Sequence, residues 1–159
     1  MITDDILAAL GGRAGATRHV IDLYRVNRPG ATPGDLLAAL LTDRFFWRPA
    51  LAVAEARLAA PASTYVYEFA WRSPAIGAAH ALEIPFVFDT LATARTDLPL
   101  WPDAPQEIAD NMHAAWVNFA AAGDPGWPRF DARRAVQVFD SGGGVTLDPR
   151  RDERLAWAT

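Results

Sequence analysis

The chain has 159 residues, 51% of them hydrophobic and 21% charged, which suits one folded domain with a buried core and argues against a disordered protein. Its formal net charge of −4 provides no basic footprint for nucleic acid. Cysteine is absent, so disulfides, thiolate metal sites and a cysteine nucleophile are excluded.

The N-terminal segment lacks the features of a secretory signal. Asp4 and Asp5 stand where such a signal carries basic residues, and the apolar stretch after them is short. No apolar run approaches the length of a membrane span. We expect the chain as given to be cytoplasmic, with no membrane and no nucleic acid among its partners. A signal on a preceding segment would change the location of a longer protein.

Short helices are predicted in the first quarter of the chain. Ile6–Leu10 forms a helical stretch that we expect to stop at Gly11-Gly12. Thr17 can cap a second helix with an apolar stripe. Thr32 followed by proline is a good helix start, and Asp35 suits its first turn.

In the next part of the chain, the sequence pattern predicts one more helix and one strong strand. Asp43 is interpreted as a cap for a helix that has Pro49 in its first turn and continues through Ala50–Leu58. Thr64–Phe69 is rich in β-branched and aromatic residues, which predicts a strand. A lone strand leaves both of its edges unpaired, so we expect the chain to be part of a larger domain.

In the second half of the chain, the sequence pattern predicts an irregular stretch, a long helix and a hairpin. Thr90–Pro105 contains three prolines and is expected to be irregular. Gln106–Ala122 carries apolar residues at spacings of three and four, so it is predicted to be the longest helix, ended by Gly123. Two short strands, 136–139 and 145–147, flank a glycine-rich turn, and the polar tail is expected to end in a short helix.

One histidine lies in a segment suited to catalysis. His80 follows Gly77, Ala78 and Ala79 and precedes an apolar run that begins at Ile84. Small neighbours let a substrate approach the imidazole, and the apolar run can anchor the loop.

Four segments in this order resemble the type-B carboxylesterases, the α/β-hydrolases that include the cholinesterases. They correspond to a helix start, the last core strand, the catalytic histidine loop, and the final helix with its stop: Asp43-x-x-Phe46-x-x-Pro49, Tyr65–Phe69, Gly77–Phe88, and Trp116–Pro125 with Trp127-Pro128. The histidine loop and Gly123-Asp124-Pro125 are the specific parts. The resemblance covers about residues 40–130. It implies an α/β fold class: residues 1–159 are the C-terminal part of an α/β-hydrolase domain, with an incomplete sheet.

The resemblance gives His80 the general acid/base role in a Ser–acid–His triad. In the family, this histidine takes the proton of the serine and later protonates the leaving alcohol. No Gly-x-Ser-x-Gly nucleophile turn occurs in the sequence: Ser63 and Ser73 lack the flanking glycines, and Ser141 is followed by three glycines but has Phe139 in place of the first one. The family order is Ser, acid, His, so the serine and the acid are expected before Met1. The implied substrate is a small-molecule carboxylic ester, and no cofactor is implied.

Three further residues are candidates for supporting roles. Ala79, next to His80, is the preferred candidate for a wall of the substrate pocket. Phe45 is most simply a core residue, as are Phe46, Trp47, Phe86 and Phe88, but it is also a candidate for an acyl pocket. Glu83 comes too soon after His80 to be the family's acid, and we interpret it as a loop-fixing carboxylate that accepts backbone hydrogen bonds.

The other histidines are not interpreted as site residues. His19 and His113 are expected to be partly exposed helix residues, and the three histidines have no spacing typical of a metal site.

Three hypotheses follow from the sequence. The first is an esterase part whose histidine serves a serine outside this chain, so that the chain alone is inactive. The second is a non-catalytic remnant that associates with the missing N-terminal part, with another partner or with itself. The third is a small helical binding module with an accidental resemblance, which the four ordered matches make the weakest.

Overall fold

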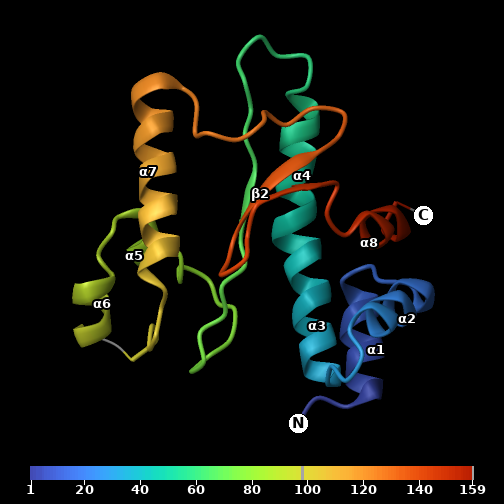
Figure 1. Ribbon diagram of the computed structural model, residues 1–159. Coiled ribbons are helices and arrows are strands. Elements are labelled where there is room, and N and C mark those ends of the chain that lie inside the picture. Colours follow the sequence, from blue (N-terminus) through green and yellow to red (C-terminus); the bar gives the residue numbers. More distant parts are fainter. Residues whose placement is uncertain (98, 159) are drawn as a thin grey trace. The chain divides into compact units, whose positions relative to one another are not determined.

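Two separately packed units make up the chain in the computed structural model. The structure describes residues 1–97 and 99–158, and Leu98 of the stretch predicted to be irregular and Thr159 of the tail lie outside them. One unit is formed by Met1–Arg57 together with the segment that starts at Arg150, and the other is Leu58–Pro149 (Figure 1).

Side-chain caps set the helix starts of the first unit. Helix α1 is Asp4–Arg13, α2 is Arg18–Asn27, α3 is Pro33–Thr42 and α8 is Arg151–Ala156. The Thr17 hydroxyl accepts the N–H of Val20 at 3.3 Å. Thr32 and Asp35 form a reciprocal capping box. Both predicted caps and the short C-terminal helix are confirmed.

The predicted helix stop at Gly11-Gly12 is wrong, because α1 continues to Arg13. Gly11 is buried, and a Cβ atom there would lie only 3.3 Å from the Ile21 side chain. This glycine therefore allows α1 and α2 to approach closely. The chain turns later, at Gly15, whose φ is +89°.

The prediction that Asp43 caps a new helix is wrong. Residues Asp43–Trp47 form a π-helical turn, η1, that runs directly from α3 into α4, Arg48–Ala56. The N–H of Arg48 donates to the carbonyl of Asp43, five residues back. Proline lacks an N–H and crowds the preceding turn, and the wider turn before Pro49 accommodates it without ending the helix.

The second unit contains the strands. The described residues form one sheet in the order β1-β2-β3, with β1 at Tyr67–Phe69, β2 at Ala135–Phe139 and β3 at Val145–Leu147. Strands β2 and β3 form the predicted antiparallel hairpin, with Ala135 opposite Leu147. Strand β1 pairs in parallel with β2, with Tyr67 opposite Gln137. Our expectation that both edges of this strand are unpaired is therefore wrong for one edge, and the strand is shorter than predicted.

Helices connect β1 to β2. They are α5 at Ile84–Val87, α6 at Leu91–Asp97 and α7 at Gln106–Ala122, and α5 lies against α7 (Figure 1). The bounds predicted for α7 are confirmed, and Gly123 ends it with a φ of +72°. Helix α6 corrects the prediction that residues 90–105 are irregular throughout.

Each unit has its own apolar core. In the first, Leu7, Leu36 and Leu40 surround Tyr24. In the second, the buried face of α7 packs on Phe86. The core prediction holds for Trp47 and Phe86. It is wrong for three phenylalanines, which are 59 to 66% exposed: Phe45, Phe46 and Phe88. None of the described helices is both long and apolar enough to cross a membrane.

Candidate active site

The loop that carries His80 is fixed by hydrogen bonds on its upstream side. After β1, Ser73 and Gly77 form an antiparallel bridge, with N–H···O distances of 3.0 and 2.8 Å. The buried Ser73 hydroxyl donates to the carbonyl of Leu100 at 2.6 Å and accepts the N–H of Ala75 at 3.1 Å. Both bonds of the Ser73 hydroxyl therefore stabilise the loop. This structural role agrees with the sequence, where Ser73 lacks the flanking glycines of a nucleophile turn.

Packing fixes the downstream side of the same loop. Leu82 is buried, and its carbonyl accepts the indole N–H of Trp101 at 3.0 Å. Four residues later Phe86 is fully buried, with its ring centroid 4.9 Å from that of Phe69 and 5.3 Å from that of Trp71. The apolar run after His80 therefore anchors the loop to the core beside β1, as the sequence suggested.

His80 lies exposed at the tip, between these two anchors. The next residue, Ala81, has a φ of +68°, a left-handed conformation that costs a non-glycine residue about 1 kcal/mol. The backbone thus turns sharply next to the imidazole. In the described part of the chain, the His80 ring makes no hydrogen bond.

Two of the three supporting candidates belong to the same loop as His80. Ala79 is exposed at the same tip. Glu83 is half-buried, and its main-chain carbonyl accepts the N–H groups of Phe86 and Val87, both at 3.0 Å. Burial raises the pKa of the Tyr67 phenol, and the Glu83 carboxylate raises it further. The carboxylate therefore acts on the side chain of Tyr67, the first residue of β1, and its loop-fixing role stays a prediction.

The third candidate, Phe45, belongs to the first unit. It lies on the π-helical turn, where the Arg44 guanidinium stands 5.6 Å from its ring centroid. Its role in an acyl pocket also stays a prediction. His113, in contrast, has a clear structural contact: its Nδ1 lies 2.9 Å from the carbonyl of Val87, which ties α7 to α5.

Sequence reasoning missed a buried polar cluster in the first unit. The Asp43 carboxylate accepts from the Tyr24 hydroxyl and from Arg150 Nη1, the latter at 3.3 Å. Burial raises the pKa of Asp43, and Arg150 opposes this rise. The Asp43-x-x-Phe46-x-x-Pro49 pattern was the signal available for this cluster, but the residues that bind Asp43 are remote in sequence.

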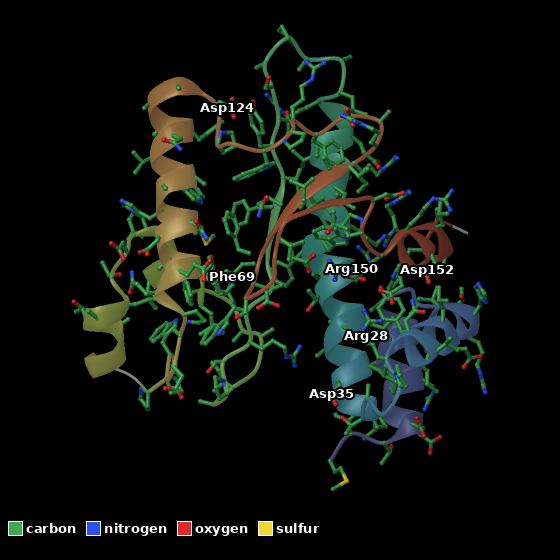
Figure 2. The ribbon with its side chains drawn as sticks, viewed as in Figure 1. Arg28, Asp35, Phe69, Asp124, Arg150 and Asp152 are labelled. Carbon is green, nitrogen blue, oxygen red and sulfur yellow. The ribbon has the colours of Figure 1, made fainter. Side chains whose placement is uncertain are left out.

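The same cluster holds α8. The Glu153 carboxylate accepts both Nη atoms of Arg28, at 2.5 and 2.9 Å, and also the Asn27 amide at 2.8 Å. Figure 2 labels Arg28, Arg150 and Asp152 where α8 meets α2. These bonds attach the C-terminal segment to the rest of the first unit.

Comparison with known proteins identifies the family. The carboxylesterase family profile matches residues 5–140. The chain belongs to the carboxylesterase family. Its helices and small incomplete sheet are accordingly part of an α/β-hydrolase fold.

Similar proteins are bacterial esterases. The chain is 32% identical over 128 residues to para-nitrobenzyl esterase of Bacillus subtilis, a match that covers 72% of this chain and 25% of that enzyme. It is 31% identical to phenmedipham hydrolase of Pseudarthrobacter oxydans, over 89% of this chain and 32% of the relative. A crystal structure of a Geobacillus stearothermophilus carboxylesterase superposes with a TM-score of 0.81 and 32% identity, over 96% of this chain and 34% of that one. The chain thus spans a quarter to a third of the length of these relatives.

Proposed function

We propose that this carboxylesterase chain supplies the general acid/base histidine of a serine esterase, and that His80 is that histidine. The observation that carries the proposal is an exposed imidazole at the tip of a loop that is anchored on both sides. Such a loop holds the base in one place, and proximity is the main requirement for proton transfer within a triad. The serine and the acid would come from segments outside the chain.

The proposed reaction is hydrolysis of a small-molecule carboxylic ester through an acyl-enzyme. The serine attacks the ester carbonyl while His80 takes its proton, and the protonated imidazole then gives that proton to the leaving alcohol. In the second half, His80 activates the water that releases the acid. His80 moves the protons, but the bond to the acyl group is made by the serine, so the chain alone should be inactive because it lacks that nucleophile.

A hybrid enzyme tests this proposal. The chain would replace the segment that it matches in the Geobacillus carboxylesterase, and hydrolysis of a nitrophenyl ester would be measured for the hybrid and for the isolated chain. We expect the hybrid to be active and the isolated chain to hydrolyse the ester no faster than its His80→Ala variant. A folded but inactive hybrid, as judged by circular dichroism, would contradict the proposal. So would fast hydrolysis by the isolated chain that His80→Ala abolishes.

The second candidate function is association without catalysis. An apolar hollow of about 170 Å³ lies between β1 and α7, and the aromatic residues that line it are Tyr65, Tyr67, Trp116, Phe119 and Trp127. Trp116 and Phe119 are 44 and 46% exposed. Contiguous exposed apolar surface favours association with the missing N-terminal part or with a second copy. Size-exclusion chromatography separates the two functions, because a stable monomer would count against self-association.

A further inference from the structure

Two consecutive residues outside the His80 loop bind both of its sides. On the upstream side, the Ser73 hydroxyl donates to the carbonyl of Leu100 at 2.6 Å. On the downstream side, the indole N–H of Trp101 donates to the carbonyl of Leu82 at 3.0 Å. One dipeptide, Leu100–Trp101, thus forms a brace that joins the two sides of the loop.

The brace is itself fixed in the core of the second unit. Trp101 is buried, Leu100 is half-buried, and both pack in the apolar cluster of this unit. The N–H of Ala104 donates to the carbonyl of Trp101 at 3.3 Å, which closes a turn directly after the brace. Pro99 and Pro102 flank the brace and restrict its backbone. A segment that is packed and restricted in this way is a firm support for the two hydrogen bonds.

The bond from Trp101 falls next to the strained turn of the loop. Ala81, with its φ of +68°, lies between His80 and Leu82. A non-glycine residue keeps such a conformation only where its surroundings enforce it. The carbonyl that Trp101 binds belongs to the residue directly after Ala81, so this bond fixes the backbone where the strain must be maintained.

The backbone bonds that the turn makes with itself are long. The nitrogen of Leu82 lies 3.5 Å from the carbonyl oxygen of Ala79, and the nitrogen of Ile84 lies 3.4 Å from that of Ala81. Both distances exceed the usual range of about 2.7–3.2 Å, whereas the 3.0 Å bond from Trp101 falls within it. The brace therefore supports the turn more strongly than the turn supports itself.

Burial makes the bond from Trp101 hard to replace. Leu82 is 1% exposed and Trp101 is 9% exposed, so water has little access to the Leu82 carbonyl. A buried carbonyl without a donor is costly, and the loop would have to shift to find another one. Because His80 lies two residues before Leu82, such a shift would move the imidazole.

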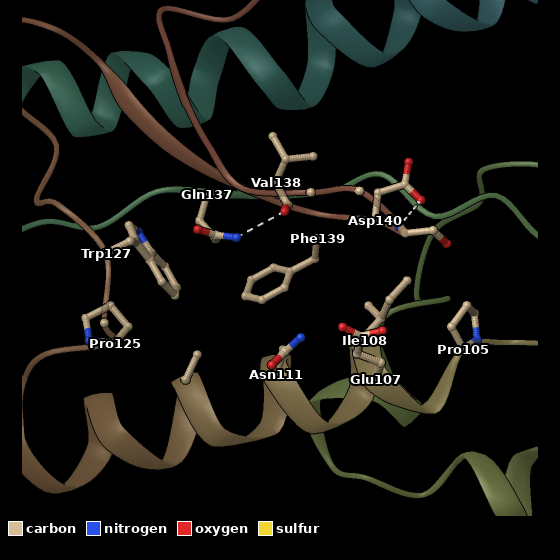
Figure 3. Close-up of a pocket in the computed structure, with 15 residues that line it drawn as sticks. Pro105, Glu107, Ile108, Asn111, Pro125, Trp127, Gln137, Val138, Phe139 and Asp140 are labelled. Atoms are coloured by element: carbon tan, nitrogen blue, oxygen red, sulfur yellow. Dashed lines mark hydrogen bonds between the residues drawn. The ribbon is translucent and has the colours of Figure 1, made fainter.

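The brace is separate from the groove between α7 and β2. That groove has a volume of about 360 Å³, and the described residues that line it include none from the brace or from the loop between Ser73 and Leu82 (Figure 3). A change in Trp101 can therefore be tested for its effect on His80 without altering the lining of this groove.

We propose that the brace positions His80 for proton transfer, and that Trp101 is the main positioning residue. The inference rests on the proposed function, because the position of His80 affects the rate only if His80 is the base. Trp101 acts through the carbonyl of Leu82 and needs no contact with the ester or the serine. Misplacing a catalytic group by about 1 Å can lower a rate about 100-fold, so a small shift of the loop has a measurable effect.

The mobility of the loop in the full 159-residue chain tests the brace without any catalysis. Amide relaxation in nuclear magnetic resonance gives backbone order parameters for Ala79, His80 and Ala81, which we expect to be near the rigid value of about 0.85. Trp101→Phe keeps an aromatic ring but removes the N–H, and should lower them below about 0.6. Trp47→Phe is the matched control, because Trp47 is 8% exposed and its Nε1 has no partner among the described residues. It should leave the order parameters unchanged.

The hybrid with the Geobacillus carboxylesterase tests the effect on catalysis, in preparations that circular dichroism shows to be equally folded. We expect Trp101→Phe to lower kcat about tenfold and to change KM less than about twofold. Ser73→Ala removes the other bond of the brace and should also lower kcat. Since both bonds depend on one dipeptide, the double variant should lose less than the product of the two single effects. Trp47→Phe should leave kcat and KM unchanged.

Two results would overturn the positioning role. One is that the order parameters around His80 are the same in Trp101→Phe, Ser73→Ala and the unsubstituted chain, and Ser73→Ala alone decides this if Trp101→Phe does not fold. The other is that an active Trp101→Phe hybrid has the same kcat as the Trp47→Phe hybrid. Failure of the proposed function looks different: the folded hybrid would be inactive before any substitution, and the positioning role would then fall with it.

Discussion

Replacing Tyr24 by phenylalanine removes one oxygen atom from the centre of the buried cluster of the first unit. The Tyr24 hydroxyl donates to the Asp43 carboxylate and accepts the indole N–H of Trp157 at 2.9 Å. Tyr24→Phe takes the acceptor away from Trp157 and one donor away from Asp43. A buried polar group without its partner costs about 1–3 kcal/mol, and Asp43 keeps Arg150. We therefore expect the free energy of unfolding to fall by about 2–3 kcal/mol.

The loss should depend on pH. Burial raises the pKa of Asp43 and the Tyr24 hydrogen bond lowers it, so Tyr24→Phe raises it further. The folded variant then binds a proton more readily than the unfolded chain, and its stability falls as the pH rises through the folded pKa of Asp43. The deficit relative to the unsubstituted chain is therefore larger at neutral pH than in acid.

Urea denaturation followed by tryptophan fluorescence measures both effects. The control is Tyr65→Phe, because the recorded contacts of Tyr65 are ring packing against Phe119 and Trp127. This change should alter stability by less than about 0.5 kcal/mol. The reasoning is refuted if Tyr24→Phe at neutral pH costs no more than Tyr65→Phe, or if its deficit grows in acid.

Two further predictions use matched pairs of variants. Arg28→Met leaves the Glu153 carboxylate, which is 2% exposed, without its main partner and should cost about 2–4 kcal/mol in urea denaturation. Arg25→Met breaks an exposed pair with Asp4 and should change little, so equal effects would contradict the assignment. Gly123→Ala forces a side chain into a left-handed conformation and should lower the melting temperature, at a cost of about 1 kcal/mol. Gly12→Ala, at an open helix position, should raise the melting temperature, with a gain of about 0.5–1 kcal/mol in the free energy of unfolding. Shifts of the melting temperature in the same direction for both variants would contradict this reasoning.

Features that depend on neighbouring residues were predictable from the sequence. A threonine cap involves only the next three residues, so the starts of α2 and α3 were predicted at Thr17 and Thr32. The bounds of α7 were predicted for the same reason, because its apolar spacing and Gly123 are local signals. The resemblance to the carboxylesterases also rests on continuous strings of residues, such as the one around His80, and the family it indicated is confirmed.

Features that depend on distant residues were not predictable in this way. The partner of β1 lies some 70 residues further along the chain, in β2, and nothing local to Thr64–Phe69 indicates a parallel pairing. Gly11 lies inside α1 with the Ile21 side chain close to it, and this tertiary contact has no signal in the residues around Gly11. The buried Asp43 cluster requires α8, at the far end of the chain. Apolar composition did not reveal that Phe45 and Phe88 are exposed, because burial depends on what covers a residue.

The role of His80 is tested most directly in the hybrid with the Geobacillus carboxylesterase. The measurement is kcat/KM for a nitrophenyl ester in the hybrid, compared with its His80→Gln and His19→Gln variants. His19 is an exposed helix residue, so His19→Gln controls for the loss of a histidine. We predict that His80→Gln lowers kcat/KM by at least about 100-fold, the smaller end of the effect of a general base, and that His19→Gln leaves it unchanged. A His80→Gln hybrid that is folded and as active as the His19→Gln hybrid would contradict the assignment of His80 as the catalytic base.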